Sequence, residues 1–133
     1  MRALRTSARA KDLASEIWTA VNPHLPEIQS LVQLGDVLVA IWVRPNRTAG
    51  GVELPDSFKD EDVFQGKTGL ILQLGPEAFK DDDRHHYPVK PRVGDWVAYR
   101  VSDGWPFFLG SQPCRLVNER GIRMVLSRPD VVY

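Results

Sequence analysis

The sequence has a single cysteine, Cys114, among its 133 residues. One cysteine cannot form an intramolecular disulfide, which excludes a disulfide-stapled scaffold and suits a reducing compartment. An excess of charge of one sign is also missing, because 17 lysines and arginines balance 17 aspartates and glutamates. Nucleic-acid binders and polybasic membrane-surface proteins need surplus cations, so we expect neither nucleic acid nor membrane as a partner.

Long hydrophobic runs are absent as well. None approaches the roughly 20 apolar residues that a membrane-spanning helix needs. The start of the chain, residues 1–16, is rich in arginine like a transit peptide, but it contains Asp12 and Glu16 and has no apolar signal core. We therefore expect this segment to belong to the mature protein and the protein to be cytoplasmic.

Motifs of catalysis and metal binding are missing too. There is no phosphate-binding glycine loop, nucleophile elbow or pair of catalytic carboxylates. His85 and His86 follow the acidic run 81–83, but neighbouring side chains of an extended chain diverge and no second cluster completes a coordination shell. Cys114 has apolar neighbours, which favours a buried, unreactive thiol. We expect no enzyme activity, no metal and no cofactor.

The first predicted element is a helix over residues 10–21. Its apolar stripe comprises Leu13, Ile17, Trp18 and Val21. Asn22-Pro23 ends it, because the residue before a proline is pushed out of the helical conformation. A short helical turn is expected after Pro26, through residues 28–32. The stripe is expected to pack on the body of the protein or on a neighbouring subunit.

From Gly35 onward the pattern is typical of β-strands. The strand over residues 36–45 is apolar on both faces, which predicts burial on both sides or a subunit contact. Further strands are expected at 66–75, 92–101 and 121–127, with a hairpin around Gly110-Ser111. Short strands separated by glycine and proline turns predict a small β-barrel. We expect a helical arm over residues 1–34 and a barrel domain over 35–133, with most tryptophans and phenylalanines in the core or at subunit contacts.

Residues 46–65 form a long segment with few alternations between two of these strands. A stretch of this length without regular structure is unusual in a compact domain and is usually functional. A second excursion, residues 76–91, is polar and contains proline.

The order of motifs over residues 35–133 resembles the GroES-type co-chaperonins, the 10 kDa chaperonins. DVLVAIWVRP stands where that family has its opening strand, and TAGGVELPDS resembles its mobile loop. GKTGLILQLG resembles the strand after the loop, residues 76–91 take the place of the roof hairpin, and VKPRVGDWVAYRVSDG resembles the Val-Gly-Asp strand. The ending, CRLVNERGIRMVLSRPDVVY, resembles the terminal strands, whose last residues pair with the first strand of the next subunit.

The resemblance implies a mainly β protein: a small GroES-like β-barrel with a long loop, a roof hairpin and an N-terminal helical arm. It also implies a homo-oligomeric ring that docks on a chaperonin ring and assists protein folding. The docking residues would be Gly50, Gly51, Val52, Glu53, Leu54 and Pro55. In an extended segment Val52 and Leu54 point the same way and Glu53 points the other way, so a charged middle residue is compatible with an apolar groove.

Three features depart from the family pattern. In this chain 34 residues precede Gly35, Glu53 stands where an apolar residue is usual, and residues 60–62 are acidic. Small variants of this kind resemble the co-chaperonin-like proteins of bacteriophages, so we expect a phage-encoded protein in the cytoplasm of a bacterial host cell.

The main alternative is a phage virion structural protein, a capsid decoration or head–tail component built on the same barrel and located in the virion. The N-terminal helical arm is compatible with this alternative, because such arms bind neighbouring subunits in structural proteins. Two further barrel folds fit the sequence poorly. The chain lacks the cysteine and histidine zinc ligands and the nucleotide-binding domain of zinc-dependent alcohol dehydrogenases. Its net charge of zero counts against an OB-fold nucleic-acid binder.

Overall fold

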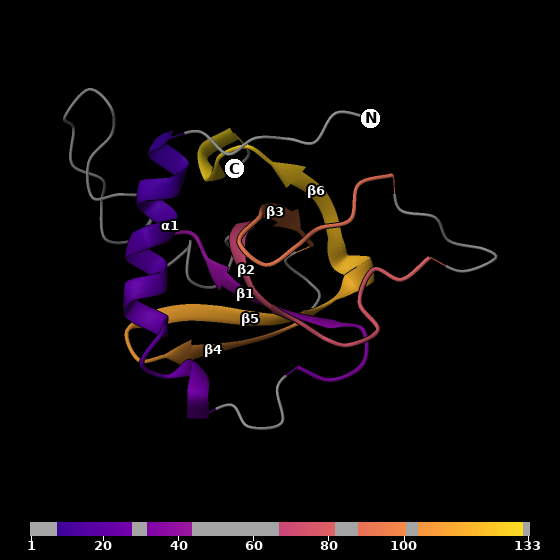
Figure 1. Cartoon of the computed structure of the whole chain (residues 1–133), viewed down its shortest axis with the longest axis horizontal. Coiled ribbons are helices and arrows are strands. Elements are labelled where there is room, and N and C mark those ends of the chain that lie inside the picture. The colour runs from indigo at the N-terminus through magenta and orange to yellow at the C-terminus, as the bar shows by residue number, and fades with distance from the viewer. Residues whose placement is uncertain (1–7, 28–31, 44–66, 82–87, 101–103, 132–133) are drawn as a thin grey trace.

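The computed structural model describes residues 8–27, 32–43, 67–81, 88–100 and 104–131. These residues form a mainly β structure, as expected, with six antiparallel strands in one sheet and one α-helix (Figure 1). The elements are α1 (Ala8–Val21), β1 (Asp36–Ile41), β2 (Thr68–Leu74), β3 (Trp96–Tyr99), β4 (Trp105–Leu109), β5 (Gln112–Asn118) and β6 (Ile122–Leu126). Three short 3-10 helices lie at Leu25–Glu27, Glu119–Gly121 and Pro129–Val131.

The strands are ordered β4-β5-β1-β2-β3-β6, so the sheet ends at β4 and at β6. In the described part of the chain, β4 is hydrogen-bonded to β5 and β6 to β3, and no ladder joins the two end strands. The pairing therefore gives one antiparallel sheet, while its closure into a barrel stays a prediction.

Local sequence explains where the strands begin and end. The hairpin predicted around Gly110-Ser111 is confirmed as β4–β5, and Gly110 has the positive φ of 60° that its turn requires. The strand predicted over 92–101 begins only at Trp96. Before it, the backbone N–H of Arg92 donates to Asp95 Oδ2 at 2.9 Å and Gly94 has a φ of 93°, which makes a turn of residues 92–95.

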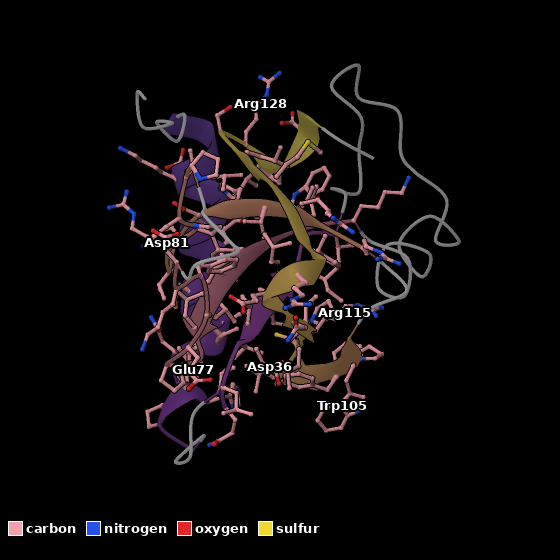
Figure 2. The ribbon with its side chains drawn as sticks, turned by 90° about the vertical axis from the view of Figure 1, so that its right-hand side faces the viewer. Asp36, Glu77, Asp81, Trp105, Arg115 and Arg128 are labelled. Carbon is pink, nitrogen blue, oxygen red and sulfur yellow. The ribbon has the colours of Figure 1, made fainter. Side chains whose placement is uncertain are left out.

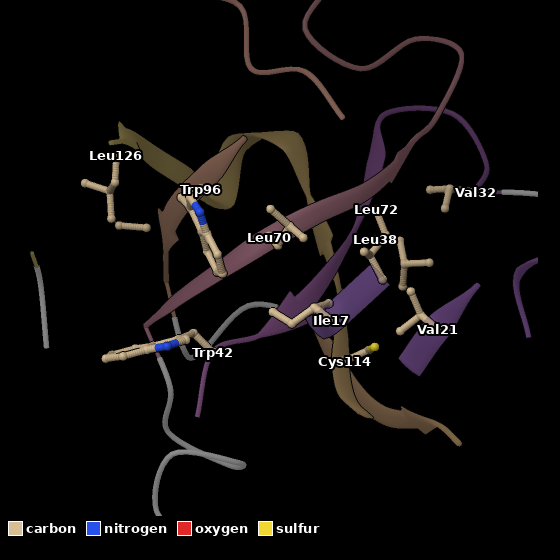
Figure 3. Packing of buried hydrophobic residues seen from close by; sticks show 12 residues of the cluster. Ile17, Val21, Val32, Leu38, Trp42, Leu70, Leu72, Trp96, Cys114 and Leu126 are labelled. Atoms are coloured by element: carbon tan, nitrogen blue, oxygen red, sulfur yellow. The ribbon is translucent and has the colours of Figure 1, made fainter. Parts of the chain in front are cut away.

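The prediction that the first strand is buried on both faces is confirmed. Alternate residues of β1 enter two apolar clusters on opposite sides of the sheet. The first, which we call the helix-side cluster, contains Leu38, Ala40, Leu70, Trp96 and Cys114 together with Ile17 and Val21 of α1 (Figure 3). The second, the opposite cluster, contains Val37, Val39, Ile71, Phe79, Val97, Tyr99 and Val117.

Helix α1 covers one face of the sheet of its own chain (Figure 1). Ile17 and Val21 are buried, whereas Leu13 and Trp18 are half-buried against the same cluster. The predicted stripe therefore faces the body of the protein, with Trp18 at its margin and not at its centre.

One assembly expectation is wrong. The first strand was expected to pair with the end of a neighbouring subunit, but β1 has β2 on one edge and β5 on the other. It has no free edge for a further strand. At the C-terminus, Pro129–Val131 form a 3-10 turn, not a strand, and residues 132–133 lie outside the described part.

The packing of α1 predicts that Ile17→Ala lowers the free energy of unfolding by about 2–5 kcal/mol, since it leaves a cavity in the helix-side cluster. Urea unfolding followed by tryptophan fluorescence measures this. Thr19→Ala is the matched control on the exposed side of the same helix and should change stability by less than about 0.5 kcal/mol. Equal effects of the two changes would show that α1 does not pack on the sheet.

Candidate functional site

The predicted docking residues, Gly50 to Pro55, lie outside the described part of the chain, but both ends of their segment are defined. Segment 44–66 connects β1 to β2, and these strands are direct antiparallel neighbours in which Ile41 stands opposite Gly69. Such neighbours are usually joined by roughly two to five residues. The connection is therefore an insertion into a hairpin whose strands already pair without it.

Backbone hydrogen bonds fix the two ends of this insertion. On the β1 side, the N–H of Trp42 donates to the carbonyl of Thr68 at 3.0 Å. On the β2 side, the N–H of Tyr99 donates to the carbonyl of Lys67 at 2.9 Å, which ties the end to β3. We call the residues at these ends the loop root. They are Ile41, Trp42, Val43, Lys67, Thr68, Gly69 and Gln112.

At the loop root, the Gln112 side chain replaces a backbone hydrogen bond that is missing between β1 and β5. Continuing the register of β1 with β5 places Ile41 opposite Pro113, which has no N–H to donate. The Gln112 side chain donates instead, from Nε2 to the Ile41 carbonyl at 3.0 Å and to the Pro113 carbonyl at 2.8 Å. The last carbonyl of β1 is thus satisfied by a side chain from β5, which holds the end of β1 where segment 44–66 departs.

Gly69 allows the two strands to approach closely at the same place. A Cβ at this position would lie 2.3 Å from Val39 Cγ1 and 2.4 Å from the carbonyl oxygen of Ala40. Any other residue would therefore push β2 away from β1. The glycine fixes the separation of the two ends of the insertion.

Helix α1 lies beside the loop root. A shallow, mostly apolar hollow of about 230 Å³ lies between them, and its lining includes Leu13 and Ile17 of α1, Trp42 and Val43, and Gln112. Trp42 is buried and belongs to the helix-side cluster (Figure 3). The loop root is therefore built on the protein core and braced by the N-terminal helix.

The second excursion, residues 76–91, is anchored where it leaves the sheet. Glu119 follows β5, and its carboxylate accepts a hydrogen bond from the backbone N–H of Phe79. Phe79 is buried in the opposite cluster with a positive φ of 58°, a conformation that non-glycine residues seldom adopt. The carboxylate and the burial of the ring together hold this turn.

The histidine and aspartate residues considered for a metal are mostly outside the described part, which omits residues 82–87. Asp81 is described and forms an ion pair with Lys90 at 3.1 Å. Within the described ranges, no group of three histidine, cysteine or acidic side chains is arranged to hold a metal ion. Over the same ranges, no helix combines the length and the apolar character needed to span a membrane.

Two buried titratable groups lie in the sheet. Burial raises the pKa of the Cys114 thiol to about 12, although a backbone hydrogen bond opposes the shift. Burial also raises the pKa of the Tyr99 hydroxyl, against the charge of the nearly buried Arg115. Both groups stay protonated at neutral pH, so neither is poised as a nucleophile or base, and the prediction of a buried Cys114 is confirmed.

The sequence analysis missed two features. The sequence does contain a signal for Gln112, because a side-chain donor directly precedes a proline in a predicted strand. Its role as donor to the Ile41 carbonyl can be recognised only once Ile41 is known to lie opposite Pro113. Trp105 and Phe108 fall on a strand pattern and were expected in the core or at subunit contacts; they are exposed at the end of the sheet, so they are not core residues, and the subunit contact stays a prediction. Strand patterning alone does not tell an end strand from an inner one.

The environment of Cys114 predicts slow alkylation in the native protein. At pH 8 a thiol with a pKa near 12 is almost entirely protonated and is also buried, so labelling by iodoacetamide should be at least about a hundredfold slower than in urea. Mass spectrometry of timed samples measures the rate. Comparable native and unfolded rates would contradict the buried position.

The Gln112 contact predicts a local effect on segment 44–66. Gln112→Leu keeps the size of the side chain but leaves the Ile41 carbonyl without its donor, which costs about 1–3 kcal/mol. Hydrogen exchange at Trp42 and cleavage within 44–66 by a trace of protease should both speed up. Ser111→Ala, in the adjacent turn, is the control and should change neither. A Gln112→Leu protein that matches wild type in both rates would remove the proposed role of Gln112.

The loop root is thus the best-defined candidate site in the described part of the chain: a rigid base carrying a long inserted segment. No protein-family model matches the sequence.

Proposed function

We propose that this protein is a non-catalytic, co-chaperonin-like docking protein that presents residues 46–65 to a chaperonin ring, and that it is encoded by a phage. The observation that carries the proposal is the insertion of this segment between strands that pair directly with each other. A hairpin that needs only a short turn has no structural use for so long a connection. Long loops on a rigid scaffold are usual carriers of binding residues.

The residues of the segment suit docking. Gly50 and Gly51 give the backbone freedom to bend, and Pro55 restricts it beyond the hydrophobic pair. Burial of Val52 or Leu54 in an apolar groove contributes about 1.5–3 kcal/mol each, and ordering of the segment consumes much of this. One loop therefore binds weakly.

Several copies would bind well. A ring that presents one loop per subunit turns each further contact into an intramolecular event, which raises the overall affinity without new contacts. A weak individual loop still allows release when the partner changes conformation. The proposal accordingly includes a homo-oligomeric ring and closure of the sheet into a GroES-like barrel.

The loop root has a defined part in this proposal. Because Trp42 and Lys67 are held by backbone hydrogen bonds and Gln112 holds Ile41, the anchor points of the segment are fixed relative to the core. Fixed ends reduce the conformational entropy lost on docking and keep the loops of a ring in register. The fixed loop root thus limits the entropy lost on docking, while the weak contacts of each single loop still allow release.

The test is a pull-down with a purified chaperonin ring, with and without nucleotide. Leu54→Ala should leave the fold intact and weaken binding sharply, because each of several loops loses the same apolar contact. Glu53→Val should strengthen binding by adding apolar surface and removing a charge near a desolvated groove. The matched control is Leu34→Ala, which shortens a leucine that is 65% exposed and lies outside the segment.

The proposal fails if the wild-type protein binds no chaperonin in any nucleotide state. Stoichiometric co-purification with intact phage particles would then identify a virion structural protein. It also fails if Leu34→Ala and Leu54→Ala weaken binding equally, since the contact would not be specific to the segment.

A further inference from the structure

Strand β6 is one end of the sheet, and one of its backbone edges is open in the described part of the chain. β3 is its neighbour in the strand order, and no ladder among the described strands joins its other edge. Figure 2 looks onto the side of the molecule that carries β6, with Arg128 just beyond the end of the strand. Unlike β4, which has Pro106 near its middle, β6 contains no proline that would remove a donor. Such an edge can accept a further extended chain.

The register shows which backbone groups of β6 point outward. Tyr99 of β3 donates its N–H to the carbonyl of Lys67, on the side where β2 lies. Val97 turns its own N–H and C=O the same way, because these groups alternate in direction along a strand. Val125 of β6 stands opposite Val97, so its N–H and C=O point away from β3 and are offered at the open edge.

A groove of about 370 Å³ accompanies this strand, and we call it the β6 groove. It lies between β6 and the stretch that contains Pro88, Val89 and Pro91, and Phe79 is also part of its lining. From β6 the lining takes four consecutive residues: Ile122, Arg123, Met124 and Val125.

These four residues do not share one face of the sheet. Ile122 and Val125 pack against the opposite cluster. Met124 stands opposite Ala98, a member of the helix-side cluster, and is 47% exposed. Residues directly opposite each other in a ladder turn their side chains to the same face. A hollow that is lined from both faces therefore runs along the edge of β6 and not over one face of it.

The bank opposite β6 offers apolar surface and few backbone donors. Pro88 and Pro91 have no N–H, and Val89 is half-buried between them. A chain that lies in the groove can therefore form its ladder only with β6. Its side chains would meet Val89, Met124 and Phe79. This combination of an open backbone edge and apolar pockets for alternate side chains is how sheets bind extended peptides.

The charges around the groove are positive. Strand β6 and residues 88–92 contain three cations and no acidic residue: Lys90, Arg92 and Arg123. Lys90 forms its ion pair with Asp81, whereas Arg92 and Arg123 are exposed. A partner that carries carboxylates matches this pattern.

From the open edge, the groove and its charge we infer that β6 binds an extended, acidic segment of another protein, which joins the sheet as a further strand. Alternate apolar side chains of that segment enter the β6 groove, and its carboxylates face Arg123. A second copy of this chain fits less well, because pairing of β6 with β6 brings two Arg123 side chains onto one short ladder, where like charges repel. This site is separate from residues 46–65 and goes beyond the docking proposed above.

The probe is a fluorescein-labelled peptide, Ser-Val-Glu-Val-Glu-Ser, and its control has lysine in place of both glutamates. Fluorescence anisotropy with the purified full-length protein should show binding of the glutamate peptide that is at least about fivefold tighter. Arg123→Glu should reverse this preference. Lys11→Glu makes the same charge change at an exposed position of α1 and should leave the preference as in wild type. A reversed preference cannot come from a variant that merely fails to fold.

Methylated peptides test the backbone ladder. Methylation of alternate peptide nitrogens removes the donors on one edge of the peptide only. Of the two versions, methylated at odd or at even positions, one should bind like the parent and the other at least about fivefold more weakly.

Three results would overturn the inference: a wild-type protein that binds neither peptide, an equal effect of Arg123→Glu and Lys11→Glu, or equal binding of the two methylated peptides. Sedimentation velocity without peptide adds a fourth. A wild-type oligomer that Arg123→Glu alters, together with no peptide binding, would identify a second copy as the occupant of the edge. None of these outcomes depends on whether the protein binds a chaperonin.

Discussion

The two-sided burial of β1 is the constraint on which the rest of the structure depends. Val37, Leu38, Val39 and Ala40 are almost completely inaccessible, and successive residues enter opposite clusters. A strand with this composition needs apolar cover on both faces and a hydrogen-bonded neighbour on both edges. Helix α1 covers one face, Phe79 and its neighbours contribute to the other, and β2 and β5 occupy the edges.

The same constraint makes the loop root rigid. Segment 44–66 begins just after β1 and returns to β2, the strand beside it. Trp42 anchors the first end in the core, Gly69 allows the closest approach of the two strands, and Gln112 satisfies the carbonyl that Pro113 leaves without a backbone donor.

Among the described strands, full pairing of β1 leaves backbone edges open only at β4 and β6. An exposed edge is a hazard for a soluble protein, and Pro106 limits the backbone pairing that β4 can offer. On β4 itself, Trp105 and Phe108 remain exposed.

Local patterns in the sequence were sufficient for the helix, for most strands, for the β4–β5 turn at Gly110 and for the burial of β1 and Cys114, because alternation and turn residues act over a few positions. The candidate docking residues, Gly50 to Pro55, come from a sequence resemblance and lie outside the described part. Which strands are neighbours was decided only by the tertiary structure: it placed Ile41 opposite Gly69 and beside Gln112, left β1 without a free edge, and put Trp105 at the end of the sheet. Strand order depends on contacts between residues far apart in the chain, and no local pattern encodes them.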